Sequence, residues 1–162
     1  MKSMGNNLKS HMTRLAMDKL NFPTVQKVGI QMIEQLEKLH SIGYLHRDLK
    51  PQNILVGEDN QIESQEQLYL IDFGLAINYT KDKKLLREPL TDSEHIQKGY
   101  CAADGNQFFS SVNCAKNKQL SRRDDMISLG YLLIYLYSGV PPFYINSEGE
   151  SDMNILKKQK LI

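Results

Sequence analysis

Apolar residues recur at helical spacing in the first quarter of the chain. Between Thr24 and His40 they stand three or four positions apart, which is the pattern of a helix with one buried stripe: Val25, Val28, Met32, Leu36 and Leu39. Asn21 or Thr24 can cap the start of this helix. Pro23 suits its first turn, and Gly43 supplies a left-handed stop after it. The pattern predicts one amphipathic helix.

A second helix is predicted between Ser121 and Gly139, where the residues are apolar on almost every face. Ser121 followed by Asp124 resembles a capping box with the shorter acid. Gly139 and the two prolines after it form a stop signal. Because such a helix has little polar surface to leave in water, we expect other elements to enclose it as the core helix.

A short strand is predicted at Leu68–Ile71, "LYLI", pairing with Ile54–Val56 across a polar turn. This pairing would bring Asp72, which follows the strand, close to Asp48. From Thr80 to Ser110 the sequence is polar and irregular, which is typical of a long functional or mobile loop. The predicted fold is therefore mainly α with a small β element.

Composition narrows the class of protein. The 162 residues are 41% hydrophobic and 24% charged, which fits one soluble globular domain, and we expect a monomer. The net charge of +1 is too small to attract the chain to nucleic acid or to an anionic membrane surface. The longest apolar run, Met126 to Tyr137, is too short to span a bilayer. Cys101 and Cys114 form no CxxC pair, so we expect reduced thiols. The sequence opens with no signal-peptide pattern, so we expect a cytoplasmic or nuclear protein.

The candidate chemistry lies in "YLHRDLKPQNILV", where charged residues stand between apolar flanks. A loop at a site on a packed scaffold would show this pattern. Asp48, Lys50 and Asn53 belong to the stretch, and the predicted strand pairing adds Asp72. Two carboxylates and an amide are oxygen ligands suited to Mg²⁺, which is commonly shared with the phosphates of a nucleotide. An acid free of the metal could orient or deprotonate a hydroxyl.

These residues resemble two motifs of protein kinases. "HRDLKPQN", which ends at Asn53, matches the catalytic-loop pattern HRDLxxxN, and "DFG", which begins at Asp72, matches the second motif. Their order, followed by a capped apolar helix, makes the match specific. The resemblance implies that Asp48 accepts or orients the proton of the substrate hydroxyl, while Asn53 and Asp72 hold Mg²⁺.

The resemblance also implies roles for the neighbouring residues. Lys50 is similar to the lysine of serine/threonine kinases that faces the transferred phosphate of ATP. Leu55 and Ile71 would form an apolar floor under the adenine. His46 would pack under the loop as a structural residue, and Arg47 would hydrogen-bond within the activation segment.

Two further stretches resemble the casein kinase 1 family. "SRRDDMISLGY", which starts at Ser121, is similar to the family's SRRDDLESLGY, and "FSSVN", which ends at Asn113, is similar to its YASVN. Asp125 would then brace the catalytic loop from the core helix. Where the family has GTAR, this chain has "GNQF" at residues 105–108. It therefore lacks a threonine that contacts the catalytic loop and an arginine associated with anionic substrates.

The resemblance covers nearly the whole chain, residues 1–162, but only part of a kinase domain. No GxGxxG or VAIK-like strand precedes the helix at Thr24. We therefore expect a kinase-like C-terminal lobe, from the helix after the hinge to just beyond the core helix, with the N-terminal lobe absent. A truncated gene model, a pseudogene product or a relic would each have this form.

Three interpretations remain open. The first is a casein kinase 1-like serine/threonine kinase that uses ATP and Mg²⁺ on serine or threonine residues of proteins, near acidic residues. The second is a non-catalytic module that keeps the fold to bind a kinase, a substrate or a scaffold. The third is an unrelated helical domain, which the ordered motifs disfavour.

Overall fold

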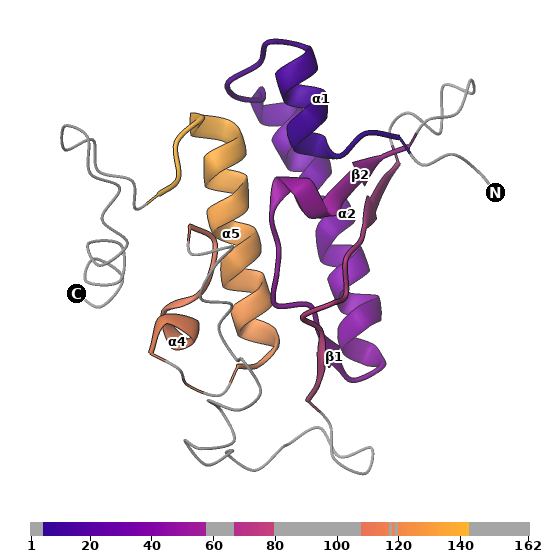
Figure 1. Cartoon of the computed structure of the whole chain (residues 1–162), viewed down its shortest axis with the longest axis vertical. Coiled ribbons are helices and arrows are strands. Elements are labelled where there is room, and N and C mark those ends of the chain that lie inside the picture. The colour runs from indigo at the N-terminus through magenta and orange to yellow at the C-terminus, as the bar shows by residue number, and fades with distance from the viewer. Residues whose placement is uncertain (1–4, 58–66, 80–107, 117, 119, 143–162) are drawn as a thin grey trace.

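The computed structural model of the chain describes residues 5–57, 67–79, 108–116, 118 and 120–142. The described part is mostly helical with two two-stranded sheets (Figure 1). Its elements are α1 (Leu8–Arg14), α2 (Phe22–Ser41), β1 (Tyr44–Leu45), the 3₁₀ helix η1 (Pro51–Asn53), β2 (Ile54–Val56), β3 (Leu68–Leu70), β4 (Ile77–Asn78), α4 (Val112–Ala115) and α5 (Arg122–Ser138). The prediction of a mainly α fold with a small β element is confirmed. Most of the expected long loop, residues 80–107, lies outside the described residues.

The amphipathic helix forms as predicted, as α2. The side chain of Asn21 accepts a hydrogen bond from the backbone nitrogen of Thr24 at 3.0 Å, and Pro23 lies in the first turn. The helix ends at Ser41, and Gly43 follows with φ = +87°. Local capping signals therefore set both ends of this helix.

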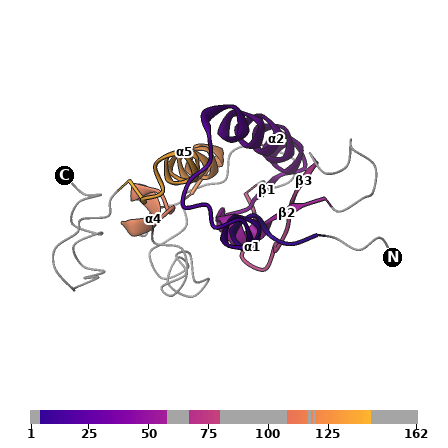
Figure 2. The ribbon, with the colours of Figure 1, turned by 90° about the horizontal axis from the view of Figure 1, so that it is seen from above.

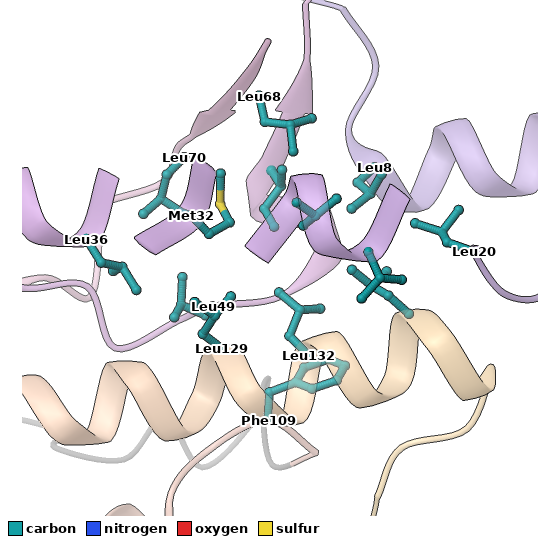
Figure 3. Packing of buried hydrophobic residues seen from close by; sticks show 14 of the residues in the cluster. Leu8, Leu20, Met32, Leu36, Leu49, Leu68, Leu70, Phe109, Leu129 and Leu132 are labelled. Atoms are coloured by element: carbon teal, nitrogen blue, oxygen red, sulfur yellow. The ribbon is translucent and has the colours of Figure 1, made fainter. Parts of the chain in front are cut away.

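The core helix also forms between its predicted ends, as α5. The backbone nitrogen of Ser121 donates to the Asp124 carboxylate at 2.7 Å, which completes the capping box. α5 runs alongside α2 in both views (Figures 1 and 2). Its buried stripe joins α1, α2 and the β2–β3 pair in one core, shown in Figure 3 and including Leu8, Met32, Leu36, Leu70, Leu129 and Leu132.

In the part of the chain that the structure describes, other elements cover only one face of α5. Leu132 and Leu136 are fully buried, whereas Ile134 is 48% exposed and Tyr137 is 55% exposed. The edge of the Tyr137 ring contacts the ring of Phe22, which is 64% exposed. The expectation that other elements surround this helix therefore holds for only one of its faces.

The predicted strand pairing is confirmed. β2 and β3 pair antiparallel, with Ile54 opposite Leu70 and Val56 opposite Leu68. The side chains of Gln31 and Gln35, both on α2, accept hydrogen bonds from the backbone nitrogens of Leu68 and Leu70 at 2.8 and 2.7 Å. These amides satisfy backbone donors of β3 that β2 leaves unpaired, and they fix the strand pair on the helix.

Two further observations bear on the expected class of protein. None of the described helices combines the length and the apolar character needed to cross a membrane. Cys114 is disulfide-bonded, so the expectation of two reduced thiols is wrong. The other cysteine of the chain, Cys101, lies outside the described residues.

The stop at Gly139 gives a prediction about stability. Gly139 has φ = +81°, and a Cβ there would lie 3.1 Å from the backbone oxygen of Asp18. Gly139→Ala should lower the free energy of unfolding by about 1–2 kcal/mol, because a left-handed conformation costs an L-residue about that much. Gly130→Ala is the matched control: it lies inside α5 with nothing within 4 Å of the added Cβ. It should be neutral or stabilising by about 0.5–1 kcal/mol. Urea denaturation compares the two, and an equal effect of both would contradict the prediction.

Candidate active site

The loop with the candidate catalytic residues connects β1 to η1 and is held from α5. The two carboxylate oxygens of Asp125 accept hydrogen bonds from the backbone nitrogens of His46 and Arg47, each at 2.9 Å. His40, at the end of α2, donates from Nε2 to the same carboxylate at 2.8 Å. Asp125 is 2% exposed. It braces the loop as the resemblance implies, through the backbone rather than through side chains of the loop.

Asp48, Lys50 and Asn53 meet around one carboxylate oxygen. Lys50 Nζ lies 2.6 Å from Oδ2 of Asp48, and Asn53 Nδ2 donates to the same oxygen at 2.9 Å. Asn53 Nδ2 also donates to the backbone oxygen of Asp48 at 2.8 Å. Asp48 and Asn53 are each 4% exposed. The structure thus brings three of the four predicted residues into direct contact and fixes the rotamer of the acid.

Asp72 is tied to this cluster through its neighbour Ile71. The backbone nitrogen of Ile71 donates to the backbone oxygen of Asn53, and His46 Nε2 donates to the backbone oxygen of Ile71, both at 3.0 Å. Asp72 itself is exposed, and its Oδ1 accepts a weak hydrogen bond from Gly74 at 3.3 Å. The strand pairing predicts that Asp72 lies close to Asp48, and both carboxylates are near enough to the His46 ring to raise its pKa.

Two residues of the site have left-handed backbone conformations. Arg47 has φ = +73° and Asp72 has φ = +64°. A non-glycine residue in this region is strained, and such strain persists where the surrounding structure holds it, often at functional sites. Both residues belong to the motifs that the sequence singles out.

His46 is fully buried beneath the loop. Burial lowers the pKa of His46 below 6.5, and this outweighs the Ile71 backbone oxygen and the carboxylates of Asp125, Asp48 and Asp72, which raise it. At neutral pH the ring is therefore uncharged in the folded protein, with Nε2 donating to Ile71 and Nδ1 facing the backbone nitrogen of Asp48 at 3.2 Å. This position agrees with the structural role expected for His46.

The lowered pKa of His46 predicts a dependence of stability on pH. Below about pH 6.5 the unfolded chain protonates this histidine while the folded chain does not, so stability falls with pH until the folded pKa is reached. The slope from one such group is at most about 1.4 kcal/mol per pH unit. His46→Gln, which keeps a donor for Ile71, should flatten the profile between pH 6.5 and 5 in thermal unfolding. Parallel profiles for both proteins would contradict the prediction.

Leu55 and Ile71 lie on one face of the β2–β3 pair. Leu55 is opposite Tyr69, and Ile71 stands two residues beyond Tyr69, so the pleat directs the three side chains to the same side. Leu55 and Ile71 are half-buried, whereas Ile54 on the opposite face is fully buried in the core. The two residues thus form an apolar surface next to Asn53.

The side chains of Asn53 and Asp72 fit a magnesium ion. Both partners of Asn53 Nδ2 are acceptors, so the amide nitrogen must face Asp48 and the amide oxygen must point elsewhere. This oxygen and the exposed carboxylate of Asp72 are hard ligands of the kind that Mg²⁺ prefers. No group of three or more His, Cys, Asp or Glu in the described part of the chain could hold a metal ion. Magnesium here would need further oxygen ligands, from phosphate and water.

Sequence reasoning missed two residues that build the site, His40 and Tyr79, and one contact of a third, Asp124. His40 supports Asp125, and its backbone oxygen accepts a hydrogen bond from the Tyr79 hydroxyl at 2.8 Å. Asp124 contacts a separate segment, residues 111–113, in addition to capping α5. The available signal was modest: His40 continues the buried stripe one turn after Leu36, where an apolar residue would be expected.

Comparison with known proteins gives the family. The protein kinase domain profile matches residues 2–162. The chain is 35% identical over 144 residues to a probable serine/threonine-protein kinase of Dictyostelium discoideum, covering 88% of this chain and 27% of that protein. It is 35% identical over 125 residues to a casein kinase I homolog of Kluyveromyces lactis, covering 77% of this chain and 22% of the homolog. It is 34% identical over 134 residues to a probable casein kinase I homolog of Encephalitozoon cuniculi, covering 82% of this chain and 36% of that homolog.

The chain thus spans about a quarter to a third of the length of these relatives. The "HRDLKPQN" loop and the "DFG" turn, the kinase profile along nearly the whole sequence and the casein kinase I relatives all agree. The chain belongs to the protein kinase family.

Proposed function

We propose that this chain carries the catalytic loop of a casein kinase 1-like serine/threonine kinase, which transfers the γ-phosphoryl group of ATP to serine or threonine hydroxyls of proteins. The observation that carries the proposal is the buried carboxylate of Asp48, fixed by Lys50 and Asn53 on a loop that Asp125 braces. Similarity to serine/threonine and casein kinase I relatives supports the substrate class.

The contacts of Asp48 suit a residue that orients a hydroxyl. Phosphoryl transfer depends on positioning and charge stabilisation more than on covalent chemistry, so a fixed acid next to a cation is the arrangement required. Asp48 accepts or orients the hydroxyl proton. Lys50 has three N–H donors and uses one toward Asp48, so the others can reach an oxygen of the transferred phosphate.

The cofactor assignment follows from the oxygen ligands. Asn53 and Asp72 hold Mg²⁺, which when bound neutralises charge on the phosphates of ATP. Leu55 and Ile71 provide the apolar surface for the adenine. These roles are supported by the shared face of Leu55 and Ile71 and by the orientation of the Asn53 amide.

We assign the described elements to the C-terminal lobe of a kinase domain, with α5 as its core helix. The remaining parts of an active kinase would then come from chain beyond these residues or from a partner. The protein substrate carries serine or threonine near acidic residues, and the protein works in the cytoplasm or nucleus as a monomer without nucleic acid. The lobe and the substrate preference rest on the resemblance to the casein kinase 1 family, whereas the location and the absence of nucleic acid rest on the sequence pattern and its net charge of +1.

A second candidate is a non-catalytic module that binds another polypeptide. One observation favours it: α2 and α5 expose neighbouring apolar side chains, including Phe22, Ile134 and Tyr137. Such a face suits a protein interface. The rest of a longer kinase chain could equally cover it, so this observation does not displace the enzyme as the first choice.

Transfer of labelled phosphate tests the proposal. The sample is an active-length protein containing this chain, either its full-length form or a fusion that supplies the N-terminal lobe and last helices of a casein kinase I homolog. We expect ATP-dependent labelling of serine or threonine in an acidic protein such as casein, and loss of labelling when EDTA removes Mg²⁺. A folded protein that labels nothing would favour the binding module instead.

A further inference from the structure

A cavity of about 320 Å³ lies between α1, α2 and the β2–β3 pair. Protein interiors are packed as tightly as organic crystals and leave few voids larger than a water molecule. The volume of this cavity falls at the lower end of the range for small-molecule sites, about 300–1,000 Å³. None of the candidate catalytic residues lines it. The proposed phosphoryl transfer therefore leaves this space without a role.

Most of the cavity wall is apolar. Buried side chains from α1, α2, β3 and the connection between the two helices form it, namely Leu8, Leu20, Val28 and Leu68. Leu8, Leu20 and Leu68 are labelled in Figure 3. Val56, opposite Leu68 in the strand pair, also lines the cavity, and the pleat directs both side chains away from the face of Leu55. The strand pair therefore separates the cavity from the apolar surface proposed for adenine.

The mouth of the cavity carries exposed apolar side chains. Leu15 is 52% exposed and Met17 is 38% exposed, and both line the cavity. Between them Ala16 has φ = +51°, and the backbone nitrogen of Met17 donates to the backbone oxygen of Met12 at 2.9 Å. A left-handed conformation is unfavourable for alanine, and such strain is often found where a segment holds a ligand. The strained turn thus keeps two large apolar side chains where a bound molecule would cover them.

The polar side chains at the cavity suit an anion. Among the described residues that line it, none is acidic, and the polar ones are His11, Thr24, Lys27 and Gln31. Arg14 Nη2 lies 3.2 Å from His11 Nδ1. A guanidinium group can only donate, so Nδ1 accepts this hydrogen bond and the neutral ring carries its hydrogen on Nε2. His11 Nε2 and the Lys27 ammonium group are therefore donors for a negatively charged group.

We propose that this cavity binds a small amphiphilic anion, namely the carboxylate of an unbranched hydrocarbon chain. The chain lies among the apolar walls, and the carboxylate lies at the mouth beside Lys27 and His11. Apolar cavities bind small apolar molecules, and each buried methylene group raises the affinity about three- to fourfold. The site goes beyond the proposed phosphoryl transfer, and neither proposal requires the other.

Calorimetric titration of the active-length protein with butanoate, hexanoate and octanoate tests the site, with octanol as the uncharged ligand. Lys27→Met removes the charge and keeps an apolar stem of similar length. Lys38→Met is the matched control, because Lys38 is exposed on the same helix about three turns further along. Val56→Phe adds volume to the cavity wall. Thermal unfolding verifies that each variant is folded, and octanoate binding is repeated with saturating Mg-ATP.

We expect the Kd to fall about tenfold for each pair of added methylene groups. Octanoate should bind about three- to fivefold more tightly than octanol, as for an exposed ion pair. Lys27→Met should remove this preference and Lys38→Met should keep it, while Val56→Phe should weaken octanoate about tenfold.

Three results would overturn the proposal: no saturable binding of octanoate, equal effects of the two lysine substitutions, or displacement of octanoate by Mg-ATP. Displacement would place the acid on the surface of Leu55 and Ile71 instead. If Val56→Phe unfolds, the lysine pair decides alone. None of these measurements depends on phosphoryl transfer, so a protein that binds octanoate in this pattern but transfers no phosphate would refute only the proposed function.

Discussion

Replacing Asp48 with asparagine is expected to lower the rate of phosphoryl transfer by about two orders of magnitude or more, which is the range for loss of a general base. Asparagine has nearly the same size and keeps an oxygen that can accept from Lys50 and Asn53, which now donate to Oδ2. The substitution removes the negative charge that orients the substrate hydroxyl. Because the acid is buried and held by these two donors, the local packing should change little.

The measurement is the initial rate of labelled-phosphate transfer by the active-length protein at saturating ATP. Asp18→Asn is the matched control, since Asp18 is exposed and lies between α1 and α2, outside the candidate site. Thermal unfolding of the three proteins separates lost chemistry from lost structure. If Asp48→Asn folds normally and keeps its rate, Asp48 is not the base, and the non-catalytic module becomes the better account.

The main helices and the strand pair were predictable because their signals are local. The apolar stripe that begins at Val25 predicted the helix α2, and Asn21 and Gly43 predicted where it starts and ends. The capping box at Ser121 and the helix stop at Gly139 predicted the two ends of α5. Each of these features depends on residues within a few positions of one another, so the order of residue types along the chain is enough to reveal it.

The contacts of the site were predictable only in part. The resemblance to kinases placed Asp48, Asn53 and Asp72 together, and the structure supports this through the strand pair. The bond from His40 to Asp125 joins residues 85 positions apart, and no local pattern encodes such a pairing. The second contact of Asp124 was missed for a related reason: the capping box already explained the residue, so nothing in the sequence called for another partner.

The exposed face of α5 shows another limit of periodicity. Apolar residues around the whole helix predict burial on all sides, but they do not say which segments provide the cover. In the described part of the chain, α2 packs against α5, the face of Leu132 and Leu136 is buried, and Ile134 on another face stays exposed. The pattern correctly indicated a helix that needs partners, and only the structure shows which of its faces is covered.

Asp125→Ala should have the largest effect on stability of any substitution at the site. It removes the acceptor for two buried donors, His40 Nε2 and the His46 backbone nitrogen, and for the half-buried backbone nitrogen of Arg47. Breaking a buried charged network by removing one partner costs about 3–5 kcal/mol, because the remaining groups stay desolvated without compensation. A typical domain is stable by about 5–15 kcal/mol, so this single change could unfold a large part of the sample.

Urea denaturation of Asp125→Ala, Asp125→Asn and His40→Ala measures how much each hydrogen-bonding group contributes to the free energy of unfolding. Asp125→Asn keeps one oxygen acceptor, so its free energy of unfolding should fall by less than that of Asp125→Ala. His40→Ala leaves both backbone bonds of Asp125 in place, so it should also lose less, although it opens space beside Tyr79, whose ring contacts His40 edge to face. If Asp125→Ala costs under about 1 kcal/mol, the carboxylate does not hold the catalytic loop, and the positioning of Asp48 must come instead from the packing of His46 and Leu49 beneath it.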